Sequence, residues 1–269
     1  STVYTSATFD SNAIKVVIAY KDQGNSNAGT AIVGTVSGTA ISFGSAAVFY
    51  GVSSSHMSTT FDSNSNKVVI AYQDNGNSDH GYAIVGTVSG TNISFGSAVV
   101  FESAAIGGSS VVFDSNSSKV VIAYSDLGNS NYGTIATGAV SGTSISFDAP
   151  FVYATVASAL TRAVYNDSAQ AVVVAYVKTG SSNHGTSTVY KNASTNITAE
   201  NYIGLSSNGY PDTAGATIDV QGAINDRQSG LTAGQSYYVQ TDGTLGTTPA
   251  DPSVFAGTAV SATKMIVKG

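Results

Sequence analysis

The sequence Phe61-Asp62-Ser63-Asn64-Ser65-Asn66-Lys67-Val68-Val69-Ile70-Ala71-Tyr72 joins a dense turn signal to an almost unbroken run of apolar, mostly β-branched residues. Asp, Ser and Asn favour turns because their short side chains hydrogen-bond the nearby backbone. A strand with one exposed face would alternate apolar and polar residues, and residues 67–72 do not. The stretch therefore predicts a tight turn followed by a β-strand that is covered on both faces.

The same stretch recurs every 52 residues, at Phe9-Asp10-Ser11-Asn12 and at Phe113-Asp114-Ser115-Asn116, with a weaker copy from Tyr165. Self-similarity at a fixed period is the signature of a repeat architecture. We place the repeats near residues 1, 53, 105 and 157. Other anchors share the period without an insertion: Tyr20, Tyr72, Tyr124 and Tyr176; Gly29, Gly81, Gly133 and Gly185; and Ile41, Ile93, Ile145 and Ile197.

Each repeat has material for four antiparallel strands, which in the second repeat are Met57–Phe61, Lys67–Tyr72, Tyr82–Val88 and Ile93–Phe101. A four-stranded meander of this length is typical of a propeller blade, which needs neighbours to bury its faces. We therefore predict an all-β fold in which residues 1–200 form a propeller-like array of four blades. The array either closes as a small propeller or is completed by blades from elsewhere, and a linear stack of β units is the alternative.

The fourth repeat is degenerate. Lys178 stands where the earlier copies carry Asp22, Asp74 and Asp126, and residues 192–197 replace the usual Val-Ser-Gly-Thr-x-Ile pattern. Terminal repeats are often atypical because they meet a different neighbour. From residue 201 the period stops, and residues 201–269 are expected to form a small separate β domain. Its expected elements are strands at Ala216–Gln221, Ser236–Gln240 and Ala259–Val267, and a hairpin turn at Thr241–Thr244.

Composition supports an all-β fold and argues against several partners. Of 269 residues, 42% are hydrophobic and only 10% are charged, so the polar surface must come largely from Ser, Thr, Asn and Gly. The 10 Lys and Arg are outnumbered by 16 Asp and Glu and form no cluster, which argues against nucleic acid. There is no Cys, and no apolar run is long enough to span a bilayer. Because Ser1 is not an initiator Met, we expect a processed or partial chain.

Two sets of repeated aspartates have alternative interpretations. Asp10, Asp62 and Asp114 could act as acids in glycan cleavage, and the loops that start at Asp22, Asp74 and Asp126 could bind calcium. Those loops lack spaced carboxylates and a closing Glu. Asp also commonly accepts hydrogen bonds from its own turn, so we assign all six a structural turn role. We predict no metal site, no cofactor and no catalytic residue, since no nucleophile or phosphate-loop motif occurs.

The best ligand-contact candidates lie where the repeats differ from each other. Ala28, His80, Tyr132 and His184 occupy one loop position next to a shared glycine, and variable loop tips on a fixed scaffold are suited to recognition. Drift on an idle surface explains the variation equally well. The repeated tyrosines at 20, 72, 124 and 176 are interpreted as core rather than as a sugar-stacking platform. Three segments between the repeats vary still more: Tyr50–Ser58, Glu102–Ser110 and Ala154–Arg162.

The last part of the chain carries a resemblance to a known family. Residues 229–243 read Ser-Gly-Leu-Thr-Ala-Gly-Gln-Ser-Tyr-Tyr-Val-Gln-Thr-Asp-Gly, and residues 256–269 read Ala-Gly-Thr-Ala-Val-Ser-Ala-Thr-Lys-Met-Ile-Val-Lys-Gly. This resembles a C-terminal module of structural, tail-fibre-like virion proteins of tailed bacteriophages, including marine ones. The repeats are also similar, more loosely, to those of phage appendage proteins. The resemblance implies a virion location, homo-oligomeric assembly with other virion proteins, and adhesion.

Together these features predict a non-enzymatic structural and adhesive component of a phage virion that contacts host surface glycans. An extracellular or cell-surface alternative is a secreted bacterial adhesin or lectin-like propeller. A glycan-degrading tail protein is the third hypothesis.

Overall fold

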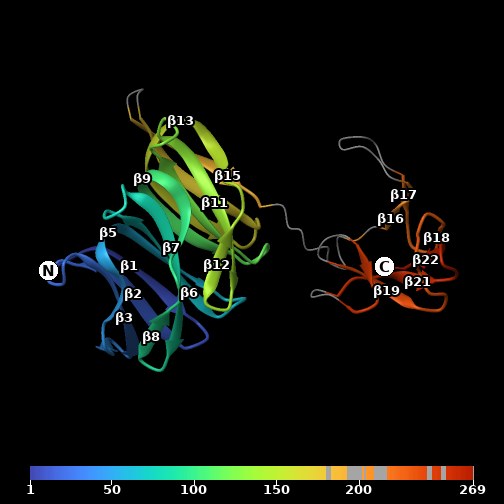
Figure 1. Ribbon diagram of the computed structural model, residues 1–269, viewed down its shortest axis with the longest axis horizontal. Coiled ribbons are helices and arrows are strands. Elements are labelled where there is room, and N and C mark those ends of the chain that lie inside the picture. The colour runs from blue at the N-terminus through green and yellow to red at the C-terminus, as the bar shows by residue number, and fades with distance from the viewer. Residues whose placement is uncertain are drawn as a thin grey trace. The chain divides into compact units, whose positions relative to one another are not determined.

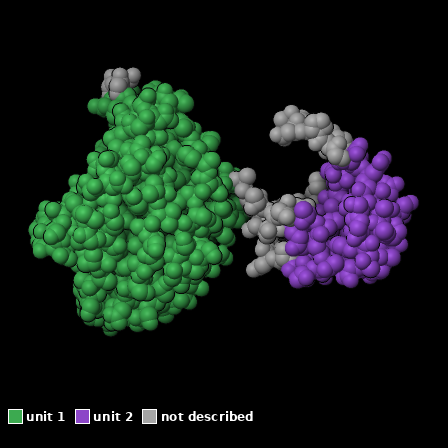
Figure 2. Space-filling view, viewed as in Figure 1, with its two compact units in different colours: residues 1–192 green, residues 193–269 purple. Residues whose placement is uncertain are grey.

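The structure is a computed structural model that describes residues 1–179, 183–192, 202, 204–208, 217–240, 244–249 and 253–268. The chain divides into two compact units, residues 1–192 (unit 1) and residues 193–269 (unit 2), which are coloured separately in Figure 2. No described residue is helical, which confirms the prediction of an all-β fold. Accordingly, no helix that could cross a membrane occurs in the described part of the chain.

Unit 1 consists of antiparallel strands that repeat with the period of the sequence (Figure 1). Its strands are β1 (Thr2–Asp10), β2 (Lys15–Asp22), β3 (Ala28–Ser37), β4 (Ala40–Phe43), β5 (Ala47–Asp62), β6 (Lys67–Asp74), β7 (His80–Ser89), β8 (Asn92–Phe95), β9 (Val99–Asp114), β10 (Lys119–Asp126), β11 (Tyr132–Ser141), β12 (Ser144–Phe147), β13 (Phe151–Asn166), β14 (Ala171–Lys178) and β15 (His184–Tyr190).

The long strands β5, β9 and β13 each belong to two successive sheets. The first part of β5 pairs with β3 as far as Ser53, and from Ser54 onward β5 pairs with β6. The strand order β1-β2-β3-β5-β6-β7-β9-β10-β11-β13-β14-β15 therefore runs from one repeat to the next without closing on itself. In Figure 1, repeat 1 lies at the lower end of unit 1 and repeat 4 at its upper end.

These long strands correct one detail of the sequence analysis. Ile93–Phe101 is not one strand, because β8 ends at Phe95 and β9 begins at Val99. Gly96 lies in this interruption, and its lack of a side chain lets neighbouring repeats approach each other, since a Cβ there would lie 1.9 Å from the carbonyl oxygen of Thr143 in the next repeat. The variable segments between the repeats lie inside the long strands, as with Tyr50–Ser58 in β5.

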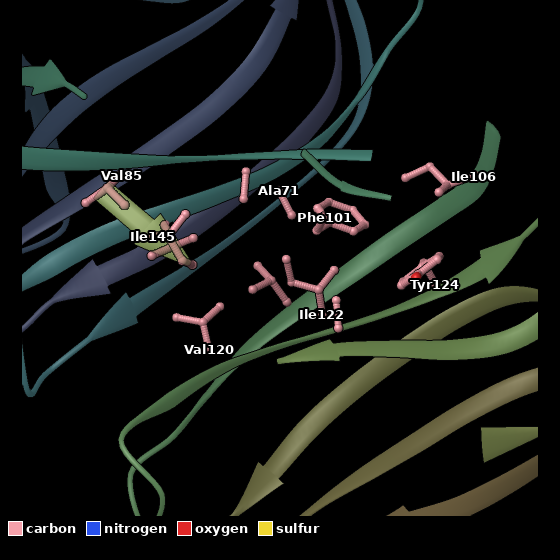
Figure 3. Close-up of a cluster of buried hydrophobic side chains, with 12 residues drawn as sticks. Ala71, Val85, Phe101, Ile106, Val120, Ile122, Tyr124 and Ile145 are labelled. Carbon is pink, nitrogen blue, oxygen red and sulfur yellow. The ribbon is translucent and has the colours of Figure 1, made fainter. Parts of the chain in front are cut away.

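The sheets of repeats 2 and 3 pack one face against the repeat before them and the other against the repeat after them. The central strand is therefore covered on both faces in repeats 2 and 3, as the sequence predicts, and Val68–Tyr72 are fully buried. Between repeats 2 and 3, small residues such as Ala71 and Val85 face larger ones such as Ile122 and Tyr124 (Figure 3). Burying one such large side chain contributes about 1.5–3 kcal/mol.

One kind of hydrogen bond recurs along the array and joins β1 to β5, β5 to β9 and β9 to β13, here called the inner strands. The hydroxyl oxygens of Ser6, Ser58 and Ser110 accept the backbone N–H groups of Thr59, Val111 and Ala163, at 3.0, 3.0 and 2.9 Å. Each acceptor lies one repeat before its donor, so the bonds form a ladder along the inner strands. Because strand faces alternate, this ladder helps to fix the register between sheets.

Unit 2 has a small core of its own, formed by Leu231, Tyr237, Val254, Ala256 and Met265 among others. The predicted strand Ala259–Val267 is a hairpin instead, because the chain turns after Ala259 and pairs Thr258 with Ile266. Part of the predicted 216–221 strand and most of the 241–244 turn lie outside the described residues. The strands of unit 2 are β16 (Leu205–Ser206), β17 (Ile218–Asp219), β18 (Ile224–Asn225), β19 (Ser236–Val239), β20 (Leu245–Gly246), β21 (Phe255–Ala259) and β22 (Met265–Val267).

Candidate functional site

In each repeat, the pairing of the inner strand is irregular at the same repeat position. The register shifts between Val3 and Ser6 in β1, between Ser55 and Ser58 in β5 and between Ala159 and Arg162 in β13, and a matching shift occurs where β9 pairs with β10. One residue at each shift has a left-handed backbone. These residues are Tyr4 (φ 54°), His56 (φ 52°), Gly108 (φ 103°) and Leu160 (φ 52°).

The four irregularities converge on one cavity of about 480 Å³, here called the bulge pocket. Its walls come from residues 4–6, 56–58, 107–110 and 160–162, so every repeat contributes. A left-handed conformation at a residue other than Gly costs about 1–3 kcal/mol, and such residues cluster at ligand sites. The fold thus gathers four equivalent positions, filled by Tyr, His, Gly and Leu, around one space.

An aromatic pair forms part of the pocket wall. The rings of Tyr4 and His56 lie 4.8 Å apart, centroid to centroid, with 48° between their planes. Gly108 borders the imidazole ring, since a Cβ on it would lie 3.4 Å from Nδ1 of His56, an ordinary contact distance. The pair offers a ligand an apolar ring surface beside a ring nitrogen.

Positive charge gathers at the pocket. The guanidinium of Arg162 donates one hydrogen bond, to the carbonyl of Thr161 at 2.8 Å. The Lys21 ammonium lies 5.8 Å from the Tyr4 ring centroid and donates to Ser53. Neither cation belongs to an ion pair among the described residues, whose salt bridges lie elsewhere. Partial burial and repulsion by Arg162 and Lys21 lower the pKa of His56, against an opposing attraction from Asp79.

The pocket also presents hydroxyl groups. Ser58 and Ser110 use an oxygen lone pair to accept the ladder hydrogen bond described above. A hydroxyl that accepts one hydrogen bond still carries its own hydrogen and donates it to another group. Together with Arg162 and His56, these serines make the lining rich in donors. No Asp or Glu is among the residues that line the pocket.

The predicted contact residues do not lie in the loops before the third strands, as the sequence suggests, but are the first residues of those strands, β3, β7, β11 and β15. None of them lines the bulge pocket. Ala28 is buried, His80 and Tyr132 are partly buried, and His184 is exposed. The loops before these strands are tied to the long strands, since the amide of Ser54 bonds to the carbonyl of Asn27 at 3.2 Å.

The repeated aspartates hold their own turns. Oδ1 of Asp62 accepts the backbone N–H groups of Asn64 and Ser65, at 2.9 and 3.0 Å, and Asp10 and Asp114 make the same contacts. Asp22, Asp74 and Asp126 each accept the N–H of the glycine two residues later. Within the described residues, no group of three or more His, Cys, Asp or Glu side chains could hold a metal ion.

The repeated tyrosines differ with their position in the array. Tyr72 and Tyr124 are fully buried, and burial raises the pKa of both phenols well above the usual value. Tyr124 donates to Glu102 at 2.9 Å, whereas the Tyr72 hydroxyl is buried without a hydrogen-bond partner in the described structure. Tyr50 donates to Asp74 beside the Tyr72 ring, and its own pKa is also raised by burial.

Sequence reasoning did not single out the bulge pocket residues. The available signal was variation at one repeat position, from Tyr4 to His56, Gly108 and Leu160, and the last three lie in the segments described as variable. The bulges themselves carry no turn motif, because Ser-rich and Gly-rich strands give no local sign of their register.

Comparisons with known proteins give little beyond a distant likeness. No protein-family profile and no curated protein sequence matches the chain. Among solved structures, the Hadza microbial sialidase Hz136 is similar with a TM-score of 0.48 and 8% sequence identity. The likeness covers 74% of this chain and 48% of that one, so the chain spans about half the length of that protein.

Proposed function

We propose that the chain is a non-enzymatic structural and adhesive component of a phage virion, such as a tail fibre, appendage or decoration protein. In this proposal, the repeats are the blades of a propeller-like scaffold, and unit 2 joins the protein to copies of itself or to other virion proteins. The bulge pocket is the place where it contacts host surface glycans. The observation that carries the proposal is the convergence of four equivalent, differently filled positions on one donor-rich pocket.

The chemistry of the pocket suits a sugar that carries an acidic group. Arginine binds carboxylates through a planar fork of donors, and hydroxyl groups and an aromatic face are common elements of carbohydrate recognition. Arg162 supplies the fork, Ser58 and Ser110 supply hydroxyl donors, and the Tyr4–His56 pair supplies a ring face. An acidic glycan would also meet the positive charges of Arg162 and Lys21, neither of which forms an ion pair among the described residues.

The same lining favours binding over cleavage. Most glycoside hydrolases place two carboxyl groups about 5–9.5 Å apart on either side of the bond that breaks. The bulge pocket is lined by no carboxylate, and Asp62 and Asp114 are occupied in their turns. This supports an adhesive role rather than a glycan-degrading one.

The binding test is a glycan array probed with the full chain, with Arg162→Ala and with Lys178→Ala. Lys178 is a control cation in repeat 4 outside the lining of the pocket. We expect acidic glycans to bind the parent and Lys178→Ala alike, and binding by Arg162→Ala to fall at least tenfold. Equal binding by all three proteins, or release of shortened glycan by the parent, would overturn the proposal.

The location is tested separately by mass spectrometry of purified virions. The proposal expects the chain at a fixed ratio to the major capsid protein. Its absence from particles, together with glycan binding on the array, would instead favour a secreted adhesin.

A further inference from the structure

Within unit 1, the two ends of the repeat array leave opposite faces uncovered by another repeat. The head face is the uncovered face of repeat 1. It corresponds to the face with which repeats 2 and 3 pack against the repeat before them. The tail face is the uncovered face of repeat 4. It corresponds to the face with which repeats 1 to 3 pack against the repeat after them. The head face consists of Phe9, Val16, Ile18, Tyr20, Ile32, Val36, Ile41 and Phe43, and the tail face of Val164, Val173, Ala175, Ser187 and Val189.

The head face keeps the side chains of an internal interface. Ile41 is 42% exposed, whereas its equivalents Ile93 and Ile145 are 6% and 3% exposed. Phe43 is likewise 50% exposed, although Phe95 and Phe147 at the same repeat position pack against the inter-repeat cores. A contiguous apolar face of this kind is typical of an interaction site rather than of a surface left in water.

The tail face carries the matching half of that interface. Val173 and Ala175 are the equivalents of Val17 and Ala19, which are fully buried against repeat 2. In repeat 4 the same positions are partly or largely exposed, and Val189 is 67% exposed. Large residues on the head face would thus meet small residues on the tail face, as they do inside the chain (Figure 3).

We infer that two copies of this chain associate head to tail, with the head face of one packed on the tail face of the other. The occupant is a second copy because one chain exposes both halves of an interface that it already forms three times internally. Such a contact is heterologous, so it builds a closed ring or an open fibre. The inference does not depend on the ligand of the bulge pocket.

One internal contact would not be repeated between copies. Arg162 stands at the position where Ser6, Ser58 and Ser110 accept the ladder hydrogen bond, and Ser187 replaces Ala31 and Ala83. The seam between copies is therefore weaker than the seams within the chain. We expect a reversible association that depends on concentration.

The test uses light scattering after size exclusion on the full chain with two surface variants, Ile41→Asp on the head face and Val189→Asp on the tail face. Both side chains are exposed in the single chain, so both variants should fold, which circular dichroism checks. Leu127→Asp is the control, since Leu127 is 45% exposed and belongs to neither face.

We expect the parent and Leu127→Asp to associate, and each face variant alone to be monomeric. An equimolar mixture of the two face variants should form a dimer, because one intact head face meets one intact tail face. A monomeric parent would overturn the inference. So would association of Val189→Asp alone, which would indicate a head-to-head dimer, or association unchanged in both variants, which would indicate contact through unit 2.

Discussion

Replacing Gly81 by alanine should destabilise unit 1, whereas the same change at Gly185 should not. Each of the two glycines is the second residue of the third strand of its repeat. In repeat 2 a Cβ at this position would lie 2.5 Å from the ring of Phe101, which the first part of β9 places over the glycine. In repeat 4 no described atom lies within 4 Å of that position.

The expected magnitudes follow from this geometry. Phe101 is only 8% exposed, so its ring has little room to move and the added methyl overpacks the core, at a cost of about 1–3 kcal/mol. For a unit of this size that lowers the Tm by roughly 2–12 °C. Gly185→Ala meets open space and restricts the unfolded chain, so it should leave stability unchanged or raise it by up to about 1 kcal/mol.

Differential scanning calorimetry of the full chain measures both effects, since unit 1 and unit 2 have separate cores. Gly133→Ala provides a second copy of the test, because its Cβ would lie 2.4 Å from the ring of Tyr153. If Gly81→Ala and Gly185→Ala shift the unit 1 transition equally, the reasoning that the position of Gly81 is covered by β9 whereas that of Gly185 is open in the described part of repeat 4 is wrong.

Three further changes probe the contacts that hold the repeats. Ser58→Ala leaves the buried N–H of Val111 without its acceptor, so we expect a loss of about 1–3 kcal/mol in chemical denaturation and faster hydrogen exchange at Val111. Asp62→Ala removes the turn acceptor and should cost about 0.5–2 kcal/mol, whereas Asp62→Asn should be nearly neutral, because Asn166 fills this role in repeat 4; equal losses would contradict the turn role. Burial and the neighbouring Glu102 raise the pKa of Asp126, so its charged form opposes folding above that pKa. Asp126→Asn should therefore raise the Tm at neutral pH, and the gain should vanish near pH 3, where the parent carboxyl is protonated in both states.

The sequence predicts the fold class because the same turn and strand signals recur in successive repeats. The run from Lys67 to Tyr72 has no polar alternation, and the structure shows why, since both faces of β6 are packed. The same reasoning is incomplete for β2, where Ile18 faces outward although its residue type is the same as that of the buried Ile70. Position in the array, which no local pattern reports, decides that difference.

The bulge pocket was harder to predict than the strands. Residues such as Ser53-Ser54-Ser55 and Gly107-Gly108 have weak strand propensity and indicate a loop, yet they lie inside β5 and β9. Pairing with two successive sheets holds them extended. Only that tertiary context brings His56 and Arg162, which are far apart in sequence, to one cavity.

The measurement that tests the proposed function most directly is a crystal structure of the full chain with the acidic glycan that binds best on the array. The account predicts an intact glycan in the bulge pocket, with its acidic group at Arg162 and a sugar ring against Tyr4 or His56. A glycan seated at His80 and Tyr132 with the pocket empty, or a cleaved product in the pocket, would contradict it.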